Sequence, residues 1–381
     1  MMNCPYFPTC GGCVFRDLNV EDYRNKKNEN FRYLLEKLSS KDFKFGDSVF
    51  IDDNNRRRAT FAFEYSHKKI SLGFNKSSSH QIIDINSCLL LTDRINKIIP
   101  SLKLFLTELC SQSFTIKSGK KNILYQVTKG DVAVCEADNG VDVVLEYDAP
   151  VNLDARMLIA ELVQNNQDII RISHRKNNID TQVETILQKA LPCIQIGKYK
   201  IPLPAGGFLQ ASKKSEKALA DLVLQYLQGF EGKIADLFCG MGNFSYYLAA
   251  NLPKVQITAV DSNSDSLKIF KEAVNTNQIS NVEIKKQNLF KYPMMADEIS
   301  QFQAIVFDPP RAGAKEQCKQ IALSPTKPKI IIAVSCNPVT FINDANILLS
   351  SGYKLKEVTM VDQFVYSNHS ELVACFTNNN S

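Results

Sequence analysis

Short apolar runs alternate with longer amphipathic segments through the part of the sequence beyond residue 205. Apolar runs of strand length that are separated by helical segments indicate βαβ units, which build a parallel, doubly wound sheet. Ligands of such sheets bind in the crevice at the carboxyl ends of the strands. We therefore expect an α/β fold with a ligand site at that edge. The expected strands are 234–238, 255–261, 282–286, 304–307, 330–334, 354–361 and 372–376, and the expected helices are 243–250 and 264–278.

The first half of the sequence has a different pattern of apolar and polar residues. Short runs rich in apolar and aromatic residues are separated by polar turns, which is typical of an antiparallel sheet. Proline and glycine then gather at 202–207 and indicate a boundary. We expect an N-terminal α+β domain over 1–205, with a mainly antiparallel sheet, and a C-terminal α/β domain over 206–381. The expected N-terminal strands include 58–65, 71–74, 125–127 and 141–147, with helices near 21–38 and 91–110.

Length and composition narrow the class of protein. A chain of 381 residues suits two or three domains. The sequence has no apolar run near the ~20 residues that a membrane helix needs, and its first residues lack the pattern of a signal peptide. We therefore expect a cytoplasmic protein without a membrane partner. Its 11 cysteines would then stay reduced, which favours metal binding or catalysis over a disulfide framework.

A glycine loop between Asp236 and Phe244 joins an expected strand to an expected helix. Gly240 and Gly242 allow a ligand to approach the backbone closely, but the loop lacks the third glycine of a dinucleotide site. Asp261 ends the next strand, where a carboxylate can accept hydrogen bonds from ribose hydroxyls. The pattern favours adenosylmethionine over NAD. The alternative interpretation is a structural strand-to-helix turn.

Two later strands end in residues that suit catalysis. Asp-Pro-Pro-Arg follows one strand at 308–311, where the prolines fix the backbone and the arginine replaces the aromatic ring of amino methyltransferases. Cys336 follows the next strand. A thiolate there could add to C6 of uracil and make C5 nucleophilic, which is covalent catalysis. The alternatives are a proline-rich turn and a buried structural cysteine.

Methylation of C5 by this route also requires a base that removes the C5 proton. Glu371 lies in the loop directly before the last expected strand, and His369 stands two positions before it. A carboxylate in reach of the substrate can take such a proton. We expect Glu371 to be the base with His369 as support, and the alternative for Glu371 is a solvated residue at a strand start.

Three cysteines gather near the N-terminus. Cys4, Cys10 and Cys13 have the spacing C-x5-C-x2-C, without the second close pair of a typical zinc site. Three clustered cysteines and a distant fourth suit a [4Fe–4S] cluster, and Cys88 is the best fourth candidate. The spacing therefore predicts a metal site, with iron–sulfur favoured over zinc.

The densest basic run is Arg56-Arg57-Arg58, followed by Lys68 and Lys69. The formal net charge of +5 permits a polyanionic partner without requiring one. Such a run could neutralise RNA phosphates. The alternative is an ordinary solvated surface.

Together these motifs resemble those of the bacterial RNA (uracil-5-)-methyltransferase family. The chain has the family's segments in the family's order, and the N-terminal cysteines extend the resemblance to the iron–sulfur branch, which acts on 23S ribosomal RNA. Cys4 stands almost at the start, without the RNA-binding barrel of a larger relative. The chain is therefore most similar to the shorter enzymes that modify uracil 747. The matching segments are 208–210 (F-x-Q), 236–244, 308–311, 335–338 and 369–371.

The resemblance implies a Rossmann-like S-adenosylmethionine methyltransferase domain and a role for each matching residue. Cys336 would be the nucleophile and Glu371 the base. The residues expected to contact S-adenosylmethionine are Gln210, Phe238, Asn243, Asp261, Asn288 and Asp308. The residues expected to hold the [4Fe–4S] cluster are Cys4, Cys10, Cys13 and Cys88.

Three functions compete at this point. The leading hypothesis is a monomeric enzyme that methylates C5 of one uridine in 23S ribosomal RNA. A transfer RNA enzyme would need the same catalytic residues, so the sequence does not separate the two. A non-catalytic RNA-binding protein is disfavoured because both Cys336 and Glu371 are present. Departures from the family pattern at 209–212 and 363–368 leave the target nucleotide open.

Overall fold

The computed structural model describes residues 4–118, 121–176 and 182–378 of the chain. Its contacts divide the chain into two compact units, each assembled from separate stretches. The sequence suggested one division at residue 205, whereas the structure assigns residues 18–51 to the second unit and 202–213 to the first. The first unit consists of Met1–Asp17, Asp52–Ile194 and Pro202–Lys213, and the second of Leu18–Ile51, Gln195–Ile201 and Lys214–Ser381.

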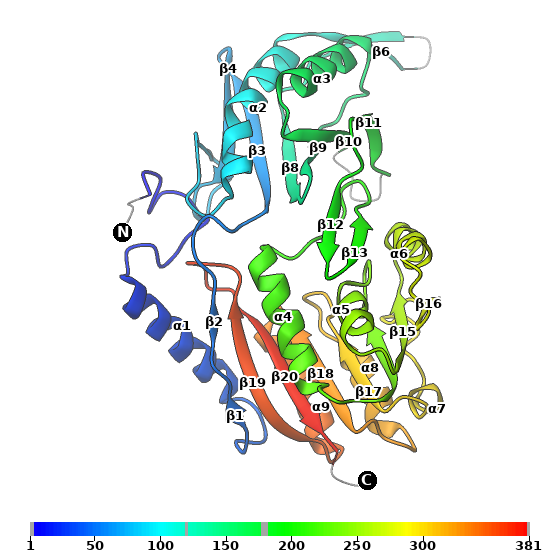
Figure 1. The fold of residues 1–381 in the computed structure, drawn as a ribbon. Helices are drawn as coiled ribbons and strands as arrows, with labels where there is room; N and C mark the ends of the chain where they lie inside the picture. The colour runs from blue at the N-terminus through cyan, green and yellow to red at the C-terminus, as the bar shows by residue number, and fades with distance from the viewer. Residues whose placement is uncertain (1–3, 119–120, 177–181, 379–381) are drawn as a thin grey trace. The chain divides into compact units, whose positions relative to one another are not determined.

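The second unit is built on a nine-stranded sheet. The strands from β18 to β16 are parallel, as the strand–helix alternation predicted, and β20 runs antiparallel between β18 and β19. Residues 18–51 belong to this unit because β1 and β2 add parallel pairs to β19. The strands in spatial order are β1 (Lys44–Phe45), β19 (Lys354–Asp362), β20 (Glu371–Thr377), β18 (Ile330–Ser335), β17 (Ala304–Phe307), β14 (Gly232–Leu237), β15 (Val255–Asp261) and β16 (Val282–Lys286), and β2 (Val49–Phe50) also pairs with β19 (Figure 1).

Helices cover both faces of this sheet (Figure 1). The apolar sides of α1, α8 and α9 form one core with the strands, whereas α4, α5 and α6 lie on the opposite face. The strand order reverses between β14 and β17, and a ligand site is expected in the loops at the carboxyl ends of these strands. The helices are α1 (Val20–Leu35), α4 (Lys213–Tyr226), α5 (Asn243–Asn251), α6 (Ser264–Thr276), α7 (Ala296–Ile299), α8 (Lys315–Leu323) and α9 (Pro338–Ser350).

The first unit contains a seven-stranded sheet. Its pairs are antiparallel, as expected, except that β9 and β10 are parallel. The sequence analysis missed this pair and the helix α3 (Leu153–Asn165), which provides the crossover that parallel neighbours require. The strands in spatial order are β11 (Glu184–Gln188), β10 (Ile169–Arg175), β9 (Gly140–Glu146), β8 (Lys129–Ala137), β3 (Arg58–Ser66), β4 (Lys69–Asn75) and β5 (Ile82–Asp84).

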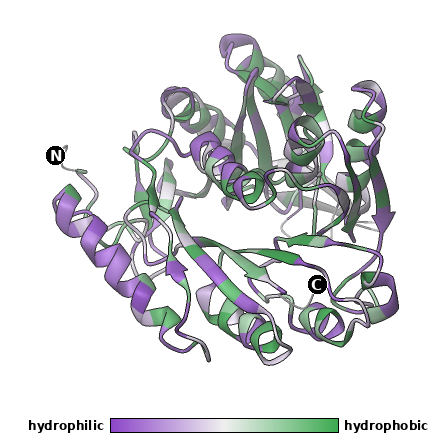
Figure 2. Ribbon diagram, turned by 60° about the horizontal axis from the view of Figure 1, so that its bottom comes forward, coloured by the Kyte–Doolittle hydropathy of each residue, from purple (hydrophilic) through white to green (hydrophobic). Residues whose placement is uncertain are grey.

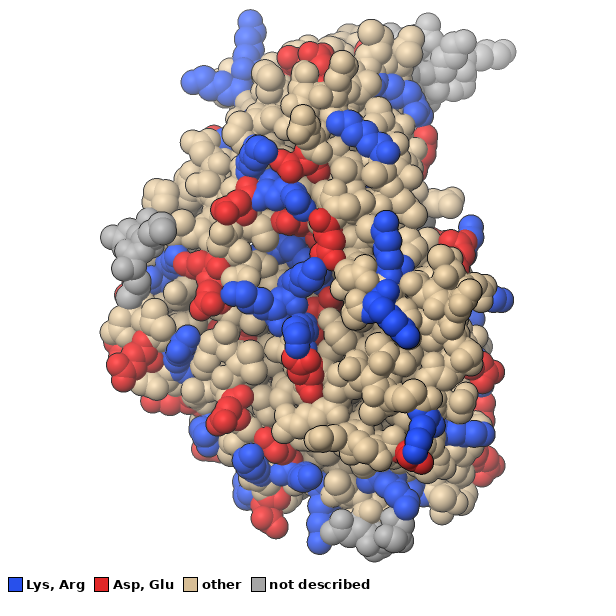
Figure 3. Space-filling model, viewed as in Figure 1, with Lys and Arg blue, Asp and Glu red and all other residues tan. Residues whose placement is uncertain are grey.

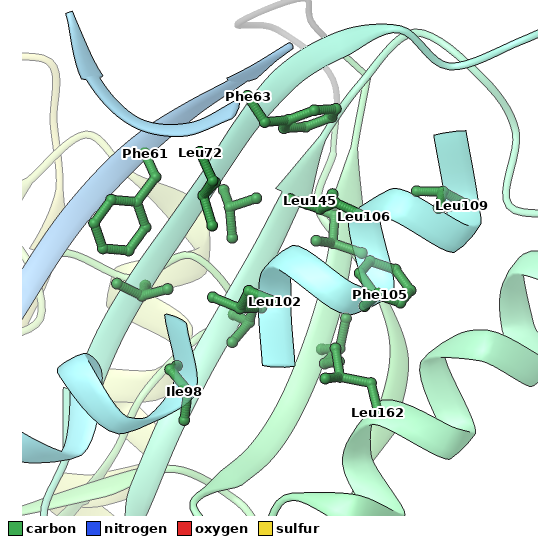
Figure 4. Packing of buried hydrophobic residues seen from close by; sticks show 14 of the residues in the cluster. Phe61, Phe63, Leu72, Ile98, Leu102, Phe105, Leu106, Leu109, Leu145 and Leu162 are labelled. Carbon is green, nitrogen blue, oxygen red and sulfur yellow. The ribbon is translucent and has the colours of Figure 1, made fainter. Parts of the chain in front are cut away.

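The core of the first unit lies between this sheet and two helices. The helix α2 (Asp93–Ser111) buries Ile98, Leu102 and Phe105 at helical spacing against Phe61 and Leu72 of the strands (Figure 4). Figure 2 shows that apolar residues are concentrated in the sheet strands and on the inner sides of the helices. Burial of these side chains supplies the main driving force for folding this unit.

Two hairpins complete the described part of the chain. They are β6 (Phe114–Ser118) with β7 (Lys121–Tyr125), and β12 (Cys193–Ile196) with β13 (Tyr199–Pro202). Among the described residues, no helix is both long and apolar enough to cross a bilayer.

Candidate active site

The glycine loop lies at the carboxyl end of β14, where the sequence predicted a cofactor site. Phe238, Gly240 and Gly242 all adopt positive φ, so the chain turns sharply away from the strand. A Cβ on Gly242 would come within 2.3 Å of the Phe270 ring, whereas a Cβ on Gly240 would meet no atom within 4 Å. Gly242 is therefore required for packing against α6, and the space in front of Gly240 is open to a ligand.

Two buried polar groups beside this loop lack complete hydrogen bonding. The side-chain oxygen and nitrogen of Asn243 are buried and have no hydrogen-bond partner among the described residues. Asp236 accepts a hydrogen bond from the Ser245 hydroxyl at 2.6 Å through Oδ2, while its buried Oδ1 has no such partner there. Burial raises the pKa of Asp236 to about 7. Buried polar groups are rarely left unpaired, so both sites fit a polar ligand.

Asp261 lies at the end of β15, beside the glycine loop. Its Oδ2 accepts a hydrogen bond from the Gly240 backbone at 2.8 Å, and its Oδ1 accepts one from the Asn263 backbone at 2.8 Å. Each carboxylate oxygen can accept more than one hydrogen bond, so Asp261 retains capacity for ribose hydroxyls. In the structure it also holds the loop against the next strand.

Phe238 and Asn288 lie in the segments that follow β14 and β16. The side-chain oxygen of Asn288 accepts hydrogen bonds from the backbone of Phe290 and Lys291, both at 3.1 Å, and thereby closes the turn after β16. The turn brings the exposed Phe290 ring to 5.3 Å from the ring of Phe238. The two rings provide an apolar surface of the kind that a planar heterocycle contacts.

The segments that follow β17 and β18 are joined by side-chain hydrogen bonds. Asn337 donates through Nδ2 to the Arg311 carbonyl at 2.9 Å, and the Thr340 hydroxyl donates to the same carbonyl at 3.2 Å. Asn337 also caps α9 by accepting from the Val339 backbone. These contacts place Cys336, directly before the cap, next to the Asp-Pro-Pro-Arg segment.

Cys336 is half-buried, and its neighbours are charged. Burial raises the pKa of its thiol to about 11, and the carboxylates of Glu371 and Asp308 add to that effect, while Arg311 opposes it. The sequence analysis required a means of lowering the thiol pKa or a nearby base. Without ligands the structure places carboxylates near the thiol and leaves the thiol protonated. A cationic ligand beside Cys336 would favour the thiolate.

Glu371 is buried, which excludes the alternative of a solvated residue at a strand start. Burial raises its pKa above the ordinary range, and burial together with the Glu371 charge raises the pKa of Asp308 in the same direction. Gln363 donates through Nε2 to Glu371 at 2.5 Å and accepts from the Ser215 hydroxyl at 3.1 Å. Glu371 is therefore held by a buried hydrogen-bond chain and has a proton affinity suited to a base near neutral pH.

Sequence reasoning did not single out two neighbours of Glu371, and it noted Arg311 only as part of the Asp-Pro-Pro-Arg segment. Gln363 and Ser215 orient Glu371, although they lie in an irregular loop and in α4. Arg311 lowers the pKa of Cys336, Glu371 and His369 through its charge. Only the family's Asp-Pro-Pro-Arg segment could have drawn attention to Arg311. The support expected from His369 is replaced by Gln363, because the His369 ring is exposed and packs edge-on against Phe364.

The basic run at 56–58 corrects the sequence interpretation. Arg57 is buried and donates through Nε to the Gln210 carbonyl at 3.0 Å, and Arg58 donates to the Leu209 carbonyl and lies 4.1 Å from the Phe208 ring centroid. These arginines therefore hold the segment that carries Gln210, within the first unit. Neither a phosphate-binding patch nor a solvated surface describes Arg57. Figure 3 shows other Lys and Arg side chains interspersed with acidic ones.

The four N-terminal candidate ligands are brought together within the first unit. Burial raises the pKa of Cys13 to about 12, with further increases from Cys88, Cys10 and Cys4, while Arg16 opposes them. The pKa of Cys88 is raised by burial and, more weakly, by Cys4 and Cys10. All four are free thiols. Among the described residues, no three His, Cys, Asp or Glu side chains are grouped closely enough for a single metal ion.

The segment with these cysteines is fixed to the sheet. Gly11 donates from its backbone to the Asn75 carbonyl at 3.0 Å, and Ser77 donates to the Thr9 carbonyl at 3.2 Å. A Cβ on Gly11 would lie 3.0 Å from that same Asn75 oxygen, so glycine permits the close approach. Burial lowers the pKa of Arg56. Cys88 and Cys13 lie near enough to oppose this effect through their charges.

Comparison with known proteins places these motifs in a wider group. Residues 19–378 match the family described as tRNA (Uracil-5-)-methyltransferase. An uncharacterized RNA methyltransferase of Brucella melitensis is 34% identical over 375 residues, which cover 98% of this chain and 83% of that protein. The 23S rRNA (uracil(1939)-C(5))-methyltransferase of Shewanella halifaxensis is 28% identical over 383 residues, with coverage of 98% and 81%.

A solved structure shares the fold. The tRNA (uracil-54, C5)-methyltransferase of Pyrococcus abyssi, crystallised with S-adenosyl-L-homocysteine, superposes with a TM-score of 0.69 at 20% sequence identity. The alignment covers 97% of this chain and 86% of that one. The similarity therefore extends over both compact units.

Proposed function

Because the chain belongs to the tRNA (uracil-5-)-methyltransferase family and is an RNA (uracil-5-)-methyltransferase, we propose that it methylates C5 of one uridine in 23S ribosomal RNA. The observation that carries the proposal is the meeting of Cys336, Asp308 and Glu371 at the carboxyl ends of β17 and β18 and the start of β20. A thiol and a buried carboxylate with raised proton affinity are the two groups that covalent C5 methylation requires.

In the proposed reaction the thiolate of Cys336 adds to C6 of uracil and forms a carbon–sulfur bond. The electron pair displaced from the C5–C6 double bond makes C5 nucleophilic. S-adenosylmethionine would supply the methyl group to C5 as its sulfur–methyl bond breaks and S-adenosylhomocysteine leaves, and its sulfonium charge would favour the Cys336 thiolate over the thiol. Glu371 then removes the C5 proton, the C5–C6 double bond re-forms, and the Cys336 thiolate leaves. The Cys336 thiolate is then free again, and Glu371 returns to its starting state when it loses the proton to solvent.

The proposed methyl-donor site uses the residues around the glycine loop. Asn243 offers a buried amide with no hydrogen-bond partner in the described ranges of the chain, and the open space at Gly240 allows close approach. Asp261 would bind the ribose, and Phe238 with Asn288 would bound the adenine. Asp308 and Gln210 complete the proposed contacts by family resemblance. The unsatisfied Asn243 amide is the structural feature that fits a polar ligand most directly.

We also propose a [4Fe–4S] cluster on Cys4, Cys10, Cys13 and Cys88. A cubane cluster bonds each thiolate to a different iron, so its four ligands stand farther apart than the ligands of one zinc ion. The four thiols are near enough to influence one another electrostatically, yet among the described residues they are not close enough to bind one metal ion. Both observations fit the wider spacing of cluster ligands. Arg16 and Arg56 would offset the negative charge of the liganded cluster.

The target nucleotide has two candidates in 23S ribosomal RNA. The resemblance to the shorter iron–sulfur enzymes suggests uracil 747, and the Shewanella relative is named for uracil 1939. A transfer RNA substrate is the second candidate function, favoured by the family description and by the substrate of the Pyrococcus enzyme. Mapping of 5-methyluridine in total RNA, from cells with and without the gene, distinguishes these three outcomes.

The covalent mechanism can be tested with 5-fluorouridine. Fluorine at C5 blocks proton removal, so RNA that carries it at the target should form a stable adduct with the enzyme and S-adenosylmethionine. We expect the adduct on denaturing gels, and we expect Cys336→Ala to abolish it. An undiminished adduct in this variant would contradict the assignment of the nucleophile.

A further inference from the structure

The first helix of the second unit is mostly exposed, and its buried side includes polar side chains. Figure 2 shows α1 as a predominantly hydrophilic helix, and Tyr23, Lys27, Phe31 and Leu35 are its buried residues, spaced four positions apart. Phe31 and Leu35 join the apolar core near α9. Tyr23 and Lys27, one turn earlier, contact a different part of the chain, and Lys27 is only 2% exposed.

Lys27 uses its whole ammonium group on one short segment. Nζ lies 2.9 Å from Oδ1 of the fully buried Asp362, and it donates to the Ser367 carbonyl at 3.0 Å and the His369 carbonyl at 2.6 Å. The ammonium group therefore makes one ion pair and two hydrogen bonds, with three partners that are close in sequence. They lie at the end of β19 and within the loop 363–370, which leads into β20.

Tyr23 contacts the same loop from the adjacent turn of the helix. Its hydroxyl donates to Oδ2 of Asp362 and accepts from the Tyr366 backbone at 2.8 Å. Tyr366 has a φ of 58°, a left-handed conformation that a bulky side chain rarely adopts. The rings of Tyr23 and Tyr366 lie 4.5 Å apart. The helix therefore stabilises a backbone conformation that the loop would not favour alone.

The loop held in this way connects directly to the proposed base. Gln363, its first residue, donates to Glu371, and Glu371 is the first residue after its end. We propose that Tyr23 and Lys27 are positioning residues that fix loop 363–370, so that Gln363 holds Glu371 where the C5 proton is removed. This inference rests on the proposed role of Glu371 and extends it to a helix remote in sequence.

The chemistry of the anchor favours this role over simple docking of α1. A buried ion pair gains little stability over apolar residues of the same volume, because both charges lose their hydration. Phe31 and Leu35 already dock the helix by apolar contact. Lys27 instead donates directional hydrogen bonds to two loop carbonyls, and directional bonds specify a backbone position that apolar contact does not.

The test separates positioning from folding by using two variants. Lys27→Met leaves Asp362 buried without its cation, a change that by itself can prevent folding. Lys27→Met/Asp362→Asn removes both charges, yet it does not restore the bonds to Ser367 and His369. Lys26→Met, an exposed residue on the same helix, is the matched control. Each protein is assayed by thermal melting, by steady-state turnover on unmodified 23S RNA transcript, and by adduct formation with the 5-fluorouridine transcript.

We expect the double variant to fold and to form the 5-fluorouridine adduct within about twofold of the control, because Cys336 precedes the proton-removal step. Its turnover should fall about tenfold or more, since misplacement of a catalytic group by about 1 Å can cost about 100-fold. A methylated covalent intermediate should accumulate on ordinary RNA. Turnover equal to that of Lys26→Met, or equal losses of adduct and turnover, would overturn the proposal.

Glu371→Gln separates this inference from the proposed function on which it rests. If Glu371→Gln accumulates the covalent intermediate and the folded double variant does not, the base assignment stands and the positioning role fails. If Glu371→Gln forms no adduct at all, the base assignment fails first. Tyr23→Phe should give a smaller loss of turnover in the same direction, because it removes the hydroxyl and keeps the ring contact.

Discussion

Cysteine occurs in two settings in this protein, and the neighbours differ more than the thiols do. Burial raises the pKa of both Cys13 and Cys336, to about 12 and about 11. The further increases for Cys13 come from three other cysteines, whereas those for Cys336 come from two carboxylates, and in each case an arginine opposes them. Mutually interacting thiols suit a shared metal cluster, and a single thiol beside a base suits a nucleophile. The chemistry of each cysteine therefore depends on which groups the fold places beside it.

The comparison would be sharpened most by replacing the base beside Cys336. Glu371→Gln should lower turnover by about 10²–10⁴-fold, because proton removal loses its acceptor. The Cys336 adduct should still form and should accumulate in its methylated state on ordinary RNA. Denaturing gels with a methyl-labelled donor measure both quantities. An inactive variant without any adduct would show that Glu371 acts before methyl transfer.

The other cysteine group is tested by removing one ligand. Anaerobically purified protein should contain about four iron atoms per chain, the content of a cubane cluster. Cys13→Ala should lose most of the iron and should lower the melting temperature, since binding of a structural metal contributes to folding. Cys135→Ala, a thiol of the same unit outside the group, is the control and should keep its iron. Retention of the full iron content by Cys13→Ala, or one zinc ion in place of iron, would contradict the cluster.

The arginine run provides a third comparison, between internal and phosphate contacts. Arg57→Met removes the guanidinium that donates to the Gln210 carbonyl, which should cost about 1–3 kcal/mol of stability. Binding of S-adenosylhomocysteine should weaken up to about tenfold, one decade for each 1.4 kcal/mol, if Gln210 contacts the donor. Lys68→Met, at an exposed position, should leave both unchanged. Calorimetric titration and thermal melting measure these effects, and unchanged values for Arg57→Met would remove its positioning role.

Sequence patterns predicted the parts of the fold that depend on local periodicity. The strands β14 to β18 and the helices α5 and α6 fall where alternation of apolar runs placed them, whereas α7 and α8 were not predicted. The motif residues lie at strand ends because βαβ topology requires it. The parallel pair of β9 and β10 was missed because α3 between them carried no recognised signal. Strands of two residues, such as β1 and β2, are too short for any periodicity to indicate.

The missed parts of the site depend on contacts between residues that are distant in sequence. Lys27 and Asp362 appear as ordinary charged residues, and only the fold shows that they pair in the interior. The run at Arg56 to Arg58 was interpreted from its charge, although charge does not show whether a guanidinium faces water or a backbone carbonyl. Gln363 had no signal at all, because its role depends on the conformation of an irregular loop.

The smallest effect expected concerns the charges around Cys336 itself. With a thiol pKa of about 11, only about one thiol in a thousand is ionised at pH 8, so carboxamidomethylation of Cys336 in ligand-free protein should be slow. Its rate should rise about tenfold per pH unit up to about pH 10, because the thiolate is the reactive form. Glu371→Gln removes a carboxylate that raises this pKa and should increase the rate at pH 8 by roughly three- to tenfold. Arg311→Gln removes a cation that lowers the pKa of Cys336 and should slow the reaction.

The peptide containing Cys135, whose pKa of about 11 has no contribution from Glu371, serves as the internal control in mass spectrometry. Opposite shifts for the two variants, at an unchanged Cys135 rate, would show that local charges control the nucleophile, and equal rates in both would contradict that view.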